Sequence, residues 1–233
     1  MKYIILVTAL GFTMPVLAQV RVVNVDFNLM PSFQDPIRPN IFPQEKYIRV
    51  VQGTPYLNDA WMKSNFVQGV AKTNVLIRLD LLENEVHYLD EAGLELIAVT
   101  PISNMLLLDT IKKKQYFFVH SSSFKTDTKI QPGWYHELMA GKVNLYKFYK
   151  KQISETLPYG QGTYEQKIHT VPEYYIFKDN ELIRVKKIND LPQILFDKEA
   201  QLDTYLVSKN FRGKDDFEYL EVLNYYVELK NKK

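Results

Sequence analysis

Four histidines are the residues of this chain best suited to metal binding or proton transfer. They are His87, His120, His136 and His169, and no two of them have the spacing of ligands on one helix. His120 and His136 fall in segments that we expect to be neighbouring strands, so their rings and Glu137 form a candidate metal site. Zinc sites that do chemistry use three protein ligands in defined geometry. The sequence offers no obvious trio of this kind, so we predict surface or strand-edge histidines, no metal and no cofactor.

Motifs for nucleophilic or acid–base catalysis are weak in this sequence. Residues 122–125 (Ser-Ser-Phe-Lys) match the Ser-x-x-Lys motif of serine–lysine acyltransferases. That chemistry needs the serine at a helix start, with the lysine one turn later as its base, whereas this match lies in a serine-rich segment. Glu83 and Glu85 form a carboxylate pair around a predicted turn, where solvation explains them more simply than a glycosidase site does. We therefore predict no catalytic residues.

An aromatic group in a predicted hairpin is the best candidate for a binding face. The chain has 16 Tyr, 13 Phe and 2 Trp, which suits either half-buried strand faces or a binding surface. The candidate binding residues are Trp134, Tyr135, Tyr146, Phe148 and Tyr149. Strand alternation puts Tyr146 and Phe148 on one face and Tyr149 on the other. One face can meet the core, and the second needs cover from the C-terminal helices, a ligand or another protein.

The first 18 residues have the layout of a secretory signal peptide. Lys2 gives a positive start, residues 4–10 are almost wholly apolar, and Val16-Leu17-Ala18 places short side chains before a cut after Ala18. The apolar run is too short to span a bilayer comfortably. We expect cleavage and export to the periplasm, to the outer membrane or out of the cell, with no membrane span after cleavage.

The composition excludes several classes of protein. There is no cysteine, so disulfides, thiolate catalysis and cysteine metal sites are ruled out. The formal net charge is only +2, whereas nucleic-acid-binding proteins show a strong basic excess. The hydrophobic fraction of 46% is that of an ordinary globular protein.

The pattern along the chain predicts an α+β fold, with an antiparallel β meander followed by a C-terminal helical hairpin or trio. Residues 19–65 are expected to form an extended N-terminal segment with a proline-rich linker, 66–188 the β domain and 189–233 the helical cap. Apolar runs separated by short turns predict the strands. The expected strands are residues 20–29, 47–51, 74–82, 85–89, 94–99, 102–108, 116–120, 134–139, 142–150, 173–178 and 181–187.

The last helix is predicted from its start signal and its apolar stripe. Asp215 and Glu218 have the spacing of a capping box. The expected buried stripe is Phe217, Leu220, Leu223 and Val227. A lone helical hairpin cannot bury such a stripe, so we expect it to pack on the sheet or on a partner.

The last fifty residues resemble a known group of proteins. Residues 174–226 contain Tyr-Tyr-Ile, Leu-Ile-Arg-Val-Lys-Lys, Leu-Pro-Gln-Ile-Leu-Phe-Asp-Lys and Leu-Asn-Tyr-Tyr, and a Gly-x-Pro-Tyr turn stands at 53–56. This resembles uncharacterised secreted or cell-envelope proteins of Bacteroidota. The resemblance implies a shared α+β build and an extracytoplasmic location, and it implies no activity.

These observations favour a non-catalytic periplasmic or cell-surface protein with a binding or envelope-assembly role. Its expected partner is another envelope protein or a small ligand, and not nucleic acid. A structural role in an outer-membrane complex, in which residues 30–44 are the segment that docks on the complex, is a variant of this hypothesis. The alternative is an extracytoplasmic hydrolase that uses carboxylate or histidine residues.

Overall fold

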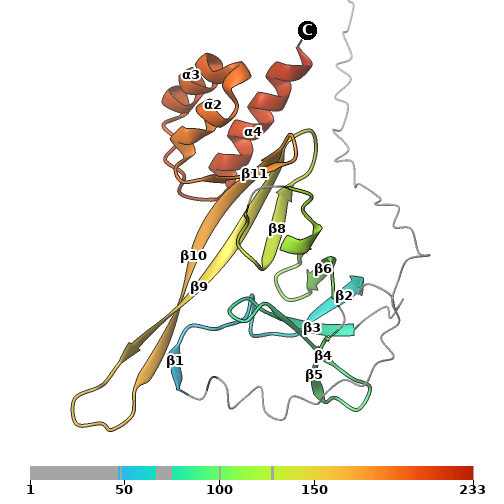
Figure 1. Cartoon of the computed structure of the whole chain (residues 1–233), viewed down its shortest axis with the longest axis vertical. Coiled ribbons are helices and arrows are strands. Elements are labelled where there is room, and N and C mark those ends of the chain that lie inside the picture. Colours follow the sequence, from blue (N-terminus) through green and yellow to red (C-terminus); the bar gives the residue numbers. More distant parts are fainter. Residues whose placement is uncertain (1–46, 48, 67–74, 100, 127–128, 233) are drawn as a thin grey trace, which may run out of the picture.

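The computed structural model describes residues 47, 49–66, 75–99, 101–126 and 129–232. The predicted signal peptide, the expected strand at residues 20–29 and the proline-rich linker lie outside these residues. The described chain forms a sheet of eleven strands and three α-helices C-terminal to it (Figure 1). The α+β class and the C-terminal helices are therefore confirmed. None of the described helices is long and apolar enough to cross a membrane.

One sheet contains every strand of the described chain. The strands are Val50–Gln52 (β1), Met62–Phe66 (β2), Val75–Asp80 (β3), Glu85–Leu89 (β4), Glu95–Ile97 (β5), Asn104–Asp109 (β6), Lys114–His120 (β7), Trp134–Met139 (β8), Asn144–Thr156 (β9), Glu165–Lys178 (β10) and Glu181–Val185 (β11). Their spatial order is β1, β10, β9, β8, β7, β6, β2, β3, β4 and β5, with β11 also paired to β10.

The predicted meander is correct for its hairpins and wrong in two connections. The hairpins β3–β4, β6–β7, β8–β9 and β10–β11 are present and antiparallel. However, β2 lies between β3 and β6, so β5 and β6 are not neighbours, and β1 pairs with β10 in parallel. The polar sequence of β2 gives no strand signal, and the predicted domain boundary at residue 66 falls on its last residue.

Two hairpins are built on the same aspartate-centred turn. Oδ1 of Asp80, at the end of β3, accepts backbone N–H bonds of 2.9 Å from each of the residues two and three positions later. Oδ1 of Asp109, at the end of β6, accepts the same two bonds, at 3.0 and 2.8 Å. The fourth residue after each aspartate has a positive φ, 62° at Asn84 and 52° at Lys113. A short polar side chain at the strand end thus fixes the turn and its register.

The longest hairpin projects away from the body of the protein. Strands β9 and β10 pair at thirteen positions, and their outer half extends beyond the other strands as a two-stranded ribbon (Figure 1). We call residues 150–171 the arm. Near its base, Gly53 has φ +83°, and a Cβ there would lie 2.0 Å from the carbonyl oxygen of Ile168, so only glycine permits this crossing.

The helices pack at the end of the β8–β11 region, away from the tip of the arm (Figure 1). They are Leu191–Ile194 (α2), Glu199–Lys209 (α3) and Asp216–Asn231 (α4), with short 3₁₀ turns at Ser121–Ser123 (η2), Ile188–Asp190 (η3) and Phe196–Lys198 (η4). Leu145 of β9 and Ile176 of β10 are fully buried against Leu202 of α3 and Leu223 of α4. The sheet and the helices therefore share one core.

The buried face of α4 differs from the predicted stripe. Its buried residues are Tyr219, Val222, Leu223 and Tyr226. Of the four predicted positions only Leu223 is among them, and Phe217 is 62% exposed. The predicted start is confirmed, because Oδ1 of Asp215 accepts a 3.1 Å bond from the N–H of Glu218. In a capping box the side chain of Glu218 would accept a hydrogen bond from the backbone N–H of Asp215. Here Oε2 of Glu218 accepts backbone N–H bonds from residues 212–214 instead.

Candidate functional site

The predicted aromatic binding residues lie inside the protein. The exposed fractions are 3% for Trp134, 0% for Tyr135, 4% for Tyr146 and 4% for Phe148, and Tyr149 is partly buried. Their side chains therefore contribute to the core in this structure and present no open aromatic face.

Two different elements cover the two faces of the β8–β9 hairpin. The helices cover the face of Leu145. The opposite face is covered by the segment after η2, where the ring of Phe124 meets Tyr146 edge-on at a centroid distance of 5.1 Å. Ile130 packs on the same cluster. The prediction of cover by the helices thus holds for only one face.

The histidines first considered for a metal are not arranged as a site. Nδ1 of His136 lies 3.0 Å from the hydroxyl of Tyr149, and burial lowers the pKa of His136 to about 4. Nδ1 of His120 contacts Ser122 at 2.8 Å instead. Glu137 follows His136 in the strand and faces the other way, where its carboxylate accepts a 3.1 Å bond from Tyr146. His136 is 4% exposed and His87 is 1% exposed, so the expectation of surface histidines is wrong for both.

A different group of titratable side chains does converge, on the β3–β4 hairpin. Asp80 is paired with Glu85 and Arg78 with His87 in the register of the two strands. Because side chains alternate across a strand, these four residues share one face. The opposite face carries apolar residues that belong to the core: Ile77, Leu79 and Val86.

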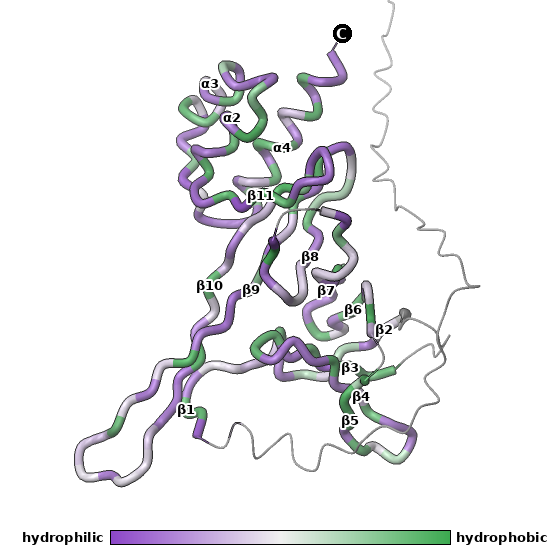
Figure 2. The backbone as a smooth tube through the Cα atoms, viewed as in Figure 1, coloured by the Kyte–Doolittle hydropathy of each residue, from purple (hydrophilic) through white to green (hydrophobic). Residues whose placement is uncertain are grey.

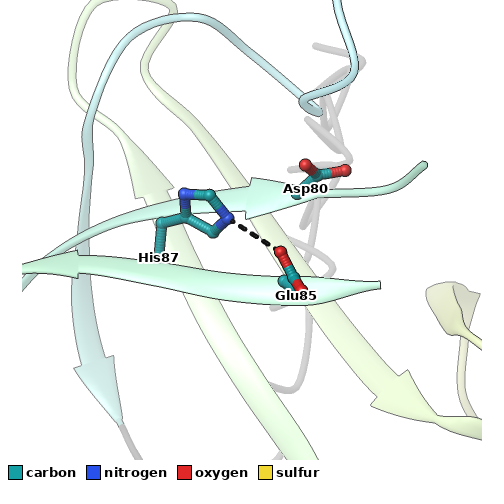
Figure 3. A group of neighbouring side chains, drawn as sticks. All are labelled: Asp80, Glu85 and His87. Carbon is teal, nitrogen blue, oxygen red and sulfur yellow. Dashed lines mark ion pairs between the residues drawn. The ribbon is translucent and has the colours of Figure 1, made fainter. Parts of the chain in front are cut away.

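We call Asp80, Glu85 and His87 the acid–histidine cluster (Figure 3). One ligand atom from each residue can be chosen so that all three lie within 4.8 Å of one another. Nε2 of His87 lies 3.4 Å from Oε2 of Glu85 and has no hydrogen-bond partner among the residues that the structure describes. The side chain of His87 is 2% exposed, so this nitrogen is buried and directed at the two carboxylates.

The other ring nitrogen of His87 is firmly held. Nδ1 lies 2.6 Å from Oε1 of Glu95, on β5. The same oxygen accepts a 2.6 Å bond from Arg78. A carboxylate at Nδ1 selects the tautomer that carries its proton there, which leaves the lone pair on Nε2. Nε2 is therefore the ring nitrogen of His87 that is directed toward Asp80 and Glu85.

Aromatic side chains from residues 47–61 cover this polar face. The ring of Tyr56 meets that of His87 edge-on at 5.6 Å, and the guanidinium of Arg78 lies over Tyr56 at 4.0 Å and over Trp61 at 4.6 Å. The hydroxyl of Tyr47 donates to Oδ2 of Asp80, and burial together with that hydrogen bond raises the pKa of Tyr47.

No protein-family model, curated protein or solved structure matches this chain. The function must therefore be argued from the residues and their geometry. The resemblance to envelope proteins of Bacteroidota stays a prediction.

The sequence carries a signal for the acid–histidine cluster. Both strands and the turn at Glu83–Asn84 were predicted. Counting register through that turn places Asp80 opposite Glu85, and His87 two residues further on the same face. The partner that fixes the imidazole, Glu95, comes from the next strand and could not be assigned from the spacing of residues alone.

Proposed function

We propose that this is an exported, non-catalytic protein that binds a strand of another cell-envelope protein along its arm. The signal-peptide pattern and the sequence resemblance support export, and the projecting arm supports docking. The observation that carries the proposal is the open edge of β9.

The arm has backbone hydrogen-bonding groups on its outer edge that the described chain does not cover. Strand β8 pairs with β9 only from Leu145 to Phe148, whereas β9 continues to Thr156 along β10. Beyond Tyr149, one side of β9 therefore has no partner strand among the described residues. An open edge of this length is a template for an added strand, and many peptide-recognition domains bind their partners this way.

The tip of the arm adds apolar side chains to this edge. The outer arm is mainly hydrophilic, with isolated hydrophobic positions (Figure 2). Tyr159 is fully exposed, and Ile153, Leu157 and Tyr164 are 43%, 47% and 48% exposed. Tyrosine anchors are enriched in protein interfaces, because the ring buries a large area and the hydroxyl stays solvated.

The buried chemistry favours this binding role over the hydrolase alternative. The carboxylates of Asp80 and Glu85 do meet a histidine, as a hydrolase would require. However, Tyr56 covers His87, and Trp61 lies over the neighbouring Arg78. This cover suits a small ion better than an organic substrate.

Site-specific photo-crosslinking in intact cells tests the docking proposal. A photo-reactive residue at position 154, on the open edge, should give one discrete heavier product, and a residue at position 111, on an exposed turn of the body, should not. The double variant Leu157→Ser, Tyr159→Ser should lower the yield at position 154 about tenfold, because two apolar anchors are lost. The matched control is Ile111→Ser, since Ile111 is 78% exposed at a different hairpin tip.

The outcomes separate the possible occupants of the edge. A product of the mass of this chain plus one other protein supports the proposal. A product of twice the mass of this chain identifies a second copy instead. Equal yields at positions 154 and 111, or a yield at 154 that the double variant leaves unchanged, would refute docking through the arm.

A further inference from the structure

We propose that the acid–histidine cluster binds one first-row divalent transition metal ion. The ligands are Nε2 of His87 and one carboxylate oxygen each from Asp80 and Glu85. This site is independent of the arm and adds a second binding function to the protein.

The histidine is held as a metal ligand is held. In metal sites a ligating imidazole usually donates its second N–H to a carboxylate, which orients the ring and raises the basicity of the ligating nitrogen. Glu95 has that position at Nδ1 of His87, and Arg78 fixes Glu95 in turn. The remaining nitrogen, Nε2, is buried and has no hydrogen bond within the described part of the chain. A buried nitrogen that lacks a partner costs stability, and an ion between it and the carboxylates would remove that cost.

The second aspartate-centred hairpin of this chain shows what the turn alone requires. In β6–β7, Asp109 makes the same two turn bonds as Asp80. There, Lys114 stands where β4 has Glu85, and Tyr116 where β4 has His87. A lysine and a tyrosine satisfy the same hairpin geometry, so the turn does not explain the glutamate and the histidine.

The charges around the cluster favour a divalent cation. Asp80, Glu85 and Glu95 face one guanidinium, that of Arg78, so the three carboxylates and the guanidinium together carry a formal charge of −2. Lys151 adds a positive charge nearby, where its Nζ donates to the carbonyl oxygens of residues 54 and 56. Burial lowers the pKa of Lys151, and Asp59 and Asp80 oppose that shift. The charge of Lys151 interacts with Asp59 as well as with Asp80, so it does not fully offset the negative charge of the cluster.

The geometry and the donor types select the class of metal. Ligands bound at about 2.0–2.2 Å to one tetrahedral ion lie about 3.3–3.6 Å apart, so the three ligand atoms, which lie within 4.8 Å of one another, must move closer by at most about 1.5 Å to bind one ion. An imidazole nitrogen with two carboxylates suits zinc, iron or manganese, whereas calcium and magnesium prefer sites built only from oxygen ligands. The side chain of Glu85 is 32% exposed, which gives an ion access from solvent.

Titration of the untagged full chain with Zn²⁺ alone, after removal of metal with EDTA, tests the site. We expect one Zn²⁺ per chain by calorimetry, with a rise in melting temperature, and no such response to Ca²⁺ or Mg²⁺. His87→Gln should weaken Zn²⁺ binding by about 100-fold and Glu85→Gln by about tenfold, while Glu95→Gln, which alters the partner of Nδ1 and of Arg78 but removes no proposed ligand, should weaken it by about 10–100-fold. His169→Gln, which alters an exposed histidine on the arm, should leave the affinity unchanged.

Each result decides for or against the metal. Absence of Zn²⁺ binding by the folded chain would overturn the proposal, as would equal affinity in His87→Gln and the unmodified protein. If His87→Gln does not fold, Glu85→Gln decides, since Glu85 lies at the open side of the cluster. X-ray absorption of the Zn²⁺-loaded protein supplies a second readout, and a spectrum with no imidazole ligand would also overturn it.

Discussion

Burial has different consequences for two histidines of this protein. At His87, a carboxylate lies beside each ring nitrogen, that of Glu95 at Nδ1 and that of Glu85 at Nε2. At His136, the neighbours are the rings of Tyr116, Phe118 and Tyr149, at centroid distances of 5.2, 5.3 and 6.0 Å. Such an environment disfavours the imidazolium, so burial first and the charges of Lys114 and Lys147 next lower the pKa of His136 to about 4.

The lowered pKa of His136 predicts a loss of stability in mild acid. The native pKa of about 4 lies below the ordinary value of 6.5. The contribution of the neutral ring is therefore complete above pH 6.5 and is lost as the pH falls toward 4. Between about pH 7 and about pH 4.5 the free energy of unfolding should fall by about 2–3 kcal/mol more in the natural chain than in His136→Phe. Urea unfolding at the two pH values measures this, and equal falls in both proteins would contradict it.

At the scale of the elements, strand alternation and turn residues predicted the hairpins, because both signals are local. The aspartates at residues 80, 90 and 109 each accept backbone N–H bonds in a turn that was predicted from the sequence. What the sequence could not supply was long-range pairing. Strand β2 sits between β3 and β6 although its own sequence is polar. The partner Glu95 of His87 depends in the same way on β5 returning beside β4.

The buried face of α4 contains two tyrosines, Tyr219 and Tyr226, that the predicted stripe leaves out. The ring of Tyr219 stacks on Tyr174 of β10 at 3.9 Å, and Tyr226 buries its ring while its hydroxyl donates to Asp197. Each tyrosine thus combines an apolar ring in the core with a polar tip near the surface. Phe217, the most apolar residue of the first turn, faces solvent instead.

Paired aromatic substitutions on α4 test this assignment. Tyr219 is 4% exposed and Phe217 is 62% exposed. Tyr219→Ala should lower the free energy of unfolding by about 3–5 kcal/mol, because a buried ring is lost and a cavity remains. Phe217→Ala should change it by less than about 0.5 kcal/mol, as at other surface positions. Chemical denaturation of both variants measures the difference. A larger loss of unfolding free energy in Phe217→Ala than in Tyr219→Ala would contradict the assignment and support the predicted stripe that contains Phe217.

At the scale of the whole molecule, the sheet divides into a packed part and a projecting part. Strands β6 and β7 lie between neighbours on both sides, and their apolar residues Met105, Leu107 and Phe118 are almost fully buried. The arm is a single ribbon, and among the described strands only the short strand β1 joins its β10 edge, near Gln166 and Lys167. A two-stranded ribbon has little stability of its own in water.

This division predicts unequal protection from hydrogen exchange. Amides of β9 in residues 150–156 should exchange at least about tenfold faster than amides of β6 and β7, because opening the ribbon breaks few buried contacts. Exchange measured by mass spectrometry on peptides from both regions checks this. The variant Leu157→Ser, Tyr159→Ser should leave both rates unchanged, since neither side chain belongs to the paired strands. Protection of residues 150–156 equal to that of β7 in the isolated chain would mean that the open edge is already occupied, and docking of a partner strand there would then be excluded.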